Sequence, residues 1–157
     1  MRRKNDRMIG CICFAVWLAT MPNIANAGTN SMLNSKLEQT VQAVRSAGSP
    51  MEQIKSAQHL AELTKGVAPS SVSDATVSDI TSLLDMPEDA VRGWVASALG
   101  HLGRRAKVAA PKLLALLPEA DCMQGDLTSA ASIRPALKRM GVEPPPAPTY
   151  SDCQKRR

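Results

Sequence analysis

The chain has 157 residues and a formal net charge of +5, but much of that charge lies in the segment Met1–Ala27. This segment holds four of the 19 basic residues and one of the 14 acidic ones, so the remaining 15 and 13 give a net charge of only +2. A balance so close to neutral argues against a general polyanion-binding protein. Only two aromatic residues, Trp94 and Tyr150, lie beyond Ala27, which argues against stacking on single-stranded nucleic acid.

The segment Met1–Ala27 has the three parts of a secretory signal peptide. A basic start precedes the apolar segment Met8–Ala19, and Ala25-Asn26-Ala27 supplies the small residues that a signal peptidase requires. The alternative is a membrane anchor, but twelve residues span only about 18 Å of a bilayer core about 30 Å thick. We therefore predict cleavage between Ala27 and Gly28, export to the periplasm or the medium, and no stable membrane span afterwards.

The rest of the chain shows helical periodicity and no convincing strand, which predicts an all-α domain over residues 28–141. Asn30 and Ser31 can cap the first helix, and Ser49 followed by Pro50 can start the second. Glycines at 66, 103 and 141 are placed to end later helices. The six predicted helices cover about 31–47, 50–65, 73–85, 87–103, 106–117 and 128–140.

Short sequence matches recur at offsets of 33 to 39 along the chain, which is typical of a stack of helix pairs. The segment Ala98–Gly103 (ALGHLG) matches Ala136–Gly141 (ALKRMG) at an offset of 38. We expect two pairs, 51–65 with 73–85 and 87–103 with 106–117. The expected core positions are Leu83, Val91, Val95, Leu99, Leu113 and Leu117.

The stretch from Pro87 to Leu117, PEDAVRGWVASALGHLGRRAKVAAPKLLALL, resembles a HEAT repeat of the short type first noted in phycobilisome lyases. The resemblance is good over these residues and partial over 50–85 and 127–141. It implies a short α-solenoid whose usual work is to hold other macromolecules, without catalytic residues or a cofactor. It also implies that Arg92 bonds a carboxylate of a neighbouring repeat. Small residues at Gly93 and Gly100 would let the helices approach closely.

Cys122 and Cys153 are the two cysteines that remain after the signal peptide. In an exported chain a disulfide between them is the expected state. A zinc site would need His59 and His101 as further ligands, and no closely spaced pair of Cys or His residues supports one. We predict that Cys122 lies in the loop before the last helix and holds the Pro-rich tail 142–157 as a strap along that helix. Tyr150 would then pack beneath the tail, and the residues after Cys153 would fray. The alternative is that the Pro-rich tail is a ligand for another domain.

Trp94 and His101 are candidate partner-binding residues. Trp94 is the only large aromatic residue of the helical region, and such a residue is either a binding anchor or part of the core. His101 lies between two glycines at a helix end, where it either contacts a partner or stabilises the helix dipole.

Arg104, Arg105 and Lys107 form the densest basic cluster of the repeat region. They are either a solvated turn that complements the helix dipole or a contact for an acidic protein or an anionic surface. The leading hypothesis is an exported, non-catalytic scaffold that binds an unidentified protein. The alternatives are an accessory factor, similar to a lyase, that acts on a protein substrate, and a module that binds an anionic surface.

Overall fold

The structure is a computed structural model that describes residues 24–123 and 128–155, and all regular structure in these ranges is helical. The predicted all-α class is therefore confirmed. The predicted signal peptide lies mostly outside the described residues. The elements are the α-helices α1 (Ile24–Ser46), α2 (Pro50–Thr64), α3 (Asp74–Ser82), α4 (Asp89–Leu102), α5 (Ala110–Cys122), α6 (Ala130–Arg139) and α7 (Tyr150–Gln154), and the 3-10 turns η1 (Pro69–Ser71), η2 (Leu83–Asp85) and η3 (Gly103–Ala109).

The ends of α2 and α3 follow from local chemistry. The Ser49 side chain accepts a hydrogen bond from the Glu52 amide, and Pro50 occupies the first turn of α2, as predicted. Ser73 caps α3 through the amide of Thr76. Glycines with positive φ, at 66, 103 and 141, follow the ends of α2, α4 and α6, because a residue without Cβ adopts this conformation freely.

Two predicted helix starts were wrong. The first helix begins at Ile24, not at Asn30 or Ser31, so the predicted cleavage site lies within α1. The fifth begins at Ala110, not at Ala106, because Pro111 fits only in a first helical turn. The residues before it form η3, where Ala106 has non-helical φ and ψ of −89° and 15°.

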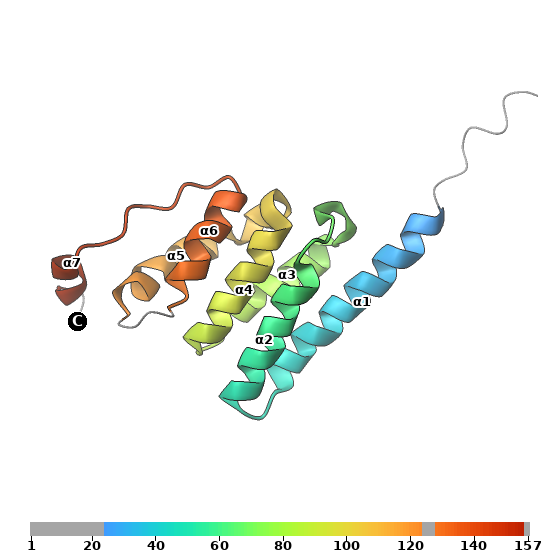
Figure 1. Ribbon diagram of the computed structural model, residues 1–157, viewed down its shortest axis with the longest axis horizontal. Coiled ribbons are helices and arrows are strands. Elements are labelled where there is room, and N and C mark those ends of the chain that lie inside the picture. Colours follow the sequence, from blue (N-terminus) through green and yellow to red (C-terminus); the bar gives the residue numbers. More distant parts are fainter. Residues whose placement is uncertain (1–23, 124–127, 156–157) are drawn as a thin grey trace, which may run out of the picture.

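Helices α2, α4 and α6 lie side by side and run in the same direction (Figure 1). Helices α3 and α5 run in the opposite direction behind this row, and the antiparallel α1 packs against α2 and α3. The most extensive backbone contacts of α2 are with α4 and α1, and those of α4 are with α2 and α6. The predicted pairs α2 with α3 and α4 with α5 are therefore not the main packing units. Parallel helices pack on each other, and the antiparallel α1 packs on α2.

One continuous hydrophobic core fills the space between these helices. All six predicted core residues belong to it, with exposed fractions of 1% or less. Helix α5 contributes Leu113 and Leu117, and α6 contributes Ile133 and Leu137.

Gly93 and Gly100, two small residues expected to allow close helix packing, both face α6 from α4, and the approach is tight at Gly100. A Cβ atom on Gly93 would lie 3.4 Å from Cα of Ser129, and one on Gly100 would lie 3.0 Å from both Cα and Cβ of Ala136. The two contacts have the same spacing along the chain, so α4 and α6 run in parallel and in register.

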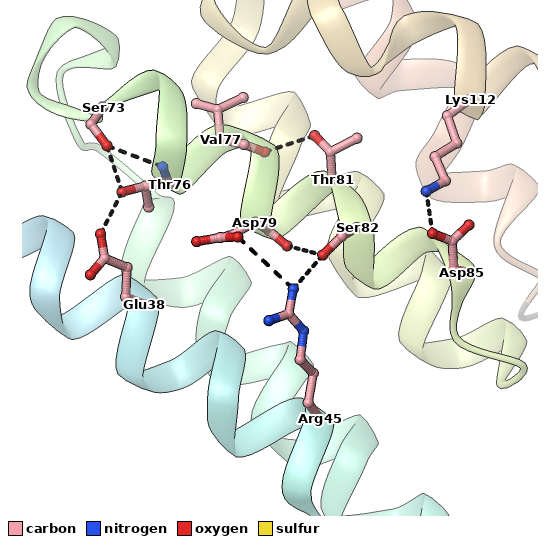
Figure 2. Close-up of polar contacts among 10 residues, drawn as sticks. All are labelled: Glu38, Arg45, Ser73, Thr76, Val77, Asp79, Thr81, Ser82, Asp85 and Lys112. Atoms are coloured by element: carbon pink, nitrogen blue, oxygen red, sulfur yellow. Dashed lines mark hydrogen bonds and ion pairs between the residues drawn. The ribbon is translucent and has the colours of Figure 1, made fainter.

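Polar contacts join α3 and η2 to the neighbouring helices α1 and α5 (Figure 2). From α1, Glu38 accepts a hydrogen bond from the Thr76 hydroxyl at 3.3 Å, and Arg45 donates to the Ser82 hydroxyl at 2.5 Å. Lys112 of α5 reaches Asp85 of η2 at 2.5 Å. These contacts join α1 to α3, and α5 to the turn η2 that directly follows α3.

Candidate binding surface

The turn η3 carries Arg104, Arg105 and Lys107, the basic cluster predicted from the sequence. One of the three is engaged within the molecule and two are not. Arg105 forms an ion pair with Asp74 at 2.9 Å, and its Nε donates to the carbonyl of Val72 at 3.3 Å. It therefore ties η3 to the start of α3. Arg104 and Lys107 are exposed, and within the described part of the chain neither has an acidic partner.

The end of α6 adds two further cations beside this turn. Lys138 and Arg139 are exposed in its last turn. Nε of Arg104 lies 3.9 Å from the position that a Cβ of Gly141 would occupy, and Nη1 of Arg139 lies 3.7 Å from that of Gly100. Arg104 and Arg139 therefore lie at the adjoining ends of α4 and α6, with Lys107 in η3 and Lys138 in the last turn of α6. We call these four residues the cationic edge.

Lys138 and Arg139 were not predicted as members of this surface. A signal was present, because the match of ALGHLG with ALKRMG places Arg139 at the position of His101. Using it required the knowledge that α4 and α6 run in parallel, so that their ends share an edge.

Several cations elsewhere in the described residues form ion pairs within the molecule. Arg92 lies 3.3 Å from Asp89 of its own helix and 3.5 Å from Glu119 of α5. The resemblance implied a carboxylate of a neighbouring repeat, but both carboxylates belong to α4 and the helix that follows it. Arg134 forms a two-pronged ion pair with Asp121, with contacts of 3.0 and 2.5 Å. The cationic edge differs from these sites because its charges are not neutralised within the described residues.

The structure places His101 and Trp94 against neighbouring helices. Nδ1 of His101 lies 3.1 Å from the Ala61 carbonyl and 3.2 Å from Oγ1 of Thr64. These contacts join α4 to the end of α2. Trp94 is half-buried and packs against the core.

Cys122 and Cys153 form a disulfide, as predicted. Cys122 is the last residue of α5 rather than a loop residue, and Cys153 lies in α7. The tail between α6 and α7 buries Pro144 and accepts a hydrogen bond from Arg134 at the Pro145 carbonyl, 2.7 Å away. The prediction that Tyr150 packs beneath the tail was wrong, since its side chain is 75% exposed.

Helix α7 was not predicted, although the sequence contains its start signal. Thr149 and Asp152 form a capping box, in which each side chain bonds the backbone amide of the other residue. The short helix sets Cys153 against the end of α5.

Within the described ranges, no group of three or more His, Cys, Asp or Glu side chains is arranged to hold a metal ion. No helix there is long and apolar enough to cross a membrane. Comparisons with protein families, curated proteins and solved structures gave no match. The resemblance to HEAT repeats therefore rests on the residues of this chain alone and stays a prediction.

Proposed function

We propose that this chain is a short HEAT-like solenoid and works, after export, as a non-catalytic module that binds another protein. The observation that carries the proposal is the nearly constant step between equivalent positions of α2, α4 and α6. Glycines with positive φ follow these helices at positions 66, 103 and 141. The two steps are therefore 37 residues (103 minus 66) and 38 residues (141 minus 103).

Contacts between the helices have a closely similar step. Gly93 faces Ser129 and Gly100 faces Ala136, and the two pairs have the same spacing along the chain. His101 bonds Thr64 at a separation of 37 residues. A step of this size, repeated across three parallel helices, is typical of stacked helix pairs, which present extended surfaces to other macromolecules.

Export is supported by two independent features. The segment Met1–Ala27 has the pattern of a cleavable signal peptide. The disulfide between Cys122 and Cys153 is of a kind that persists in oxidising compartments and is rare in the reducing cytosol.

The test is affinity capture from the exported fraction with chain 28–157 as bait. We expect one protein to be retained at a fixed ratio to the bait, and soluble chain 28–157 to compete for it. The control bait is the same chain after thermal unfolding. Retention of nothing beyond the control, at bait concentrations above those in the compartment, would contradict the proposal.

A further inference from the structure

We propose that the cationic edge binds an extended acidic segment of the partner protein. This inference rests on the proposed function for the existence of a partner, and adds where and by what chemistry the partner is held. It is carried by the placement and the unpaired state of Arg104, Lys107, Lys138 and Arg139.

The four cations lie on two elements that contact each other, η3 and the end of α6, without neutralising carboxylates. All four are exposed, and within the described residues none takes part in an ion pair. Lys36, Lys55, Lys65 and Lys155 on other elements are also exposed and unpaired there, so the edge differs from them in gathering four cations on two contacting elements. Asp74 is already engaged by Arg105. Like charges gathered in this way repel one another, and an acidic ligand would remove that repulsion while it gains charge-assisted hydrogen bonds.

Arg104 and Arg139 come from two neighbouring helix ends, and each side chain reaches toward the other helix. Nε of Arg104 lies 3.9 Å from the Cβ position of Gly141, which follows α6, and Nη1 of Arg139 lies 3.7 Å from that of Gly100 in α4. A ligand at this point contacts charges from both helices, which favours a segment with more than one carboxylate. In polyproline II, residues i and i+3 lie on one side of the chain about 9.3 Å apart, so acidic residues at every third position all face the same surface.

A protein segment fits this edge better than a membrane surface does. Surfaces that insert into the membrane interface combine basic residues with several large apolar ones, such as Trp, Phe and Leu. Among the described residues of η3 and the last turn of α6, Val108 is the only large apolar side chain that is strongly exposed, at 73%. Charge without an apolar face favours binding through carboxylates.

The test measures binding of a fluorescent peptide, (Glu-Pro-Pro)4, to the disulfide-bonded chain 28–157 by anisotropy. The variant Arg104→Gln/Lys107→Gln/Arg139→Gln removes three charges from the edge. The matched control, Lys36→Gln/Lys55→Gln/Lys155→Gln, removes three exposed charges from other elements. All six side chains are exposed, so both variants should unfold at the temperature of the parent chain.

We expect saturable binding that weakens as salt rises, with affinity about tenfold lower in the edge variant and about unchanged in the control. The peptide (Gln-Pro-Pro)4 should not bind. Equal losses in both variants would overturn the inference, because binding would then depend on net charge alone. Binding to vesicles of phosphatidylglycerol and phosphatidylcholine without binding to the peptide would also overturn it, in favour of a membrane surface.

Failure of this inference is distinguishable from failure of the proposed function. If the edge variant still captures the partner from the exported fraction as well as the parent chain does, the protein-binding function stands and the cationic edge is not the site. If the parent chain captures nothing, the proposed function fails, whatever the peptide does.

Discussion

Gly100 determines how closely α4 can approach α6. Its Cα faces Ala136 so closely that an added Cβ would lie 3.0 Å from both Cα and Cβ of that residue. Backbone atoms cannot move away as a flexible side chain can, so an added methyl group must push the helices apart. Gly93, two turns earlier on the same face, leaves 3.4 Å to the nearest atom of Ser129.

The two glycines make a matched pair of substitutions. Alanine favours a helix over glycine by about 1 kcal/mol, so Gly93→Ala should be neutral or slightly stabilising. Gly100→Ala gains the same propensity but should be less stable than Gly93→Ala by about 1–3 kcal/mol because of overpacking. Urea unfolding of both variants measures the difference. Equal stabilities would show that α4 and α6 are further apart than described.

Asp89 joins two elements at their ends. It lies in the first turn of α4, and its carboxylate accepts hydrogen bonds from the amide and the hydroxyl of Ser129, at 2.8 and 2.5 Å, at the start of α6. The same carboxylate lies 3.3 Å from Arg92. One side chain therefore neutralises a half-buried arginine and caps the next parallel helix.

Asp89→Ala should lower the free energy of unfolding by about 1–3 kcal/mol, because it leaves the buried Ser129 amide without its partner. The control is Glu88→Ala on the same turn, which should change stability by about 0.5 kcal/mol or less. Hydrogen exchange should show the loss first in the opening turn of α6. Equal effects of the two substitutions would mean that Asp89 does not cap α6.

Leu113 tests the position of α5. Its side chain is fully buried, whereas the adjacent Leu114 is only partly buried. Leu113→Ala should cost about 2–5 kcal/mol in thermal or urea unfolding, since it removes core contacts and leaves a cavity. Leu114→Ala should cost clearly less. The reverse order would mean that α5 is rotated about its axis.

Element boundaries were predictable where local chemistry determines them. Ser49, Pro50 and Gly66 delimit α2 because a cap, an N-terminal proline and a C-terminal glycine act within a few residues. The turn η3 was missed although Pro111 marks the first turn of α5, because the apolar pattern continues through Ala106, Val108 and Ala109 without a break. Periodicity shows which face of a helix is apolar, but not which helix covers that face.

The candidate site shows the same division. Arg104 and Lys107 were predictable as a basic cluster because they are close in sequence. Lys138 and Arg139 join them only through the parallel order of α4 and α6, which no local pattern specifies. The ion pair of Arg105 with Asp74 was equally unpredictable from the sequence, because the two residues are far apart along the chain.

At the scale of the whole molecule, the disulfide closes the C-terminal part of the chain on α5. The bonded cysteines are 31 residues apart. The loss of unfolded-chain entropy on closing such a loop corresponds to roughly 3.5–4 kcal/mol. Cys122→Ser/Cys153→Ser should therefore unfold at a lower temperature and become protease-sensitive from residue 142 onward, while α2 to α5 stay folded. Two titratable thiols in the non-reduced exported protein would contradict the bond.

The processing prediction also concerns the whole chain. The intact mass of the exported protein should correspond to a chain that starts at Gly28. Because α1 begins at Ile24, cleavage after Ala27 would remove the start of this helix and leave most of it in place. A chain recovered with Met1 attached would contradict both export by cleavage and the predicted signal peptide.

The bond between Cys122 and Cys153 also determines how the protein transmits mechanical force. Tension applied beyond Cys153 passes through the two sulfur atoms directly to the end of α5, so α6 and the proline-rich tail lie outside the load path. In a single-molecule pulling experiment, these residues would add nothing to the measured extension until a reducing agent is added. Reduction would then release about 100 Å of additional contour length, at about 3.3–3.6 Å per residue. An exported module held at its C-terminus would keep α6, and with it half of the cationic edge, unstretched while the rest of the chain bears the load.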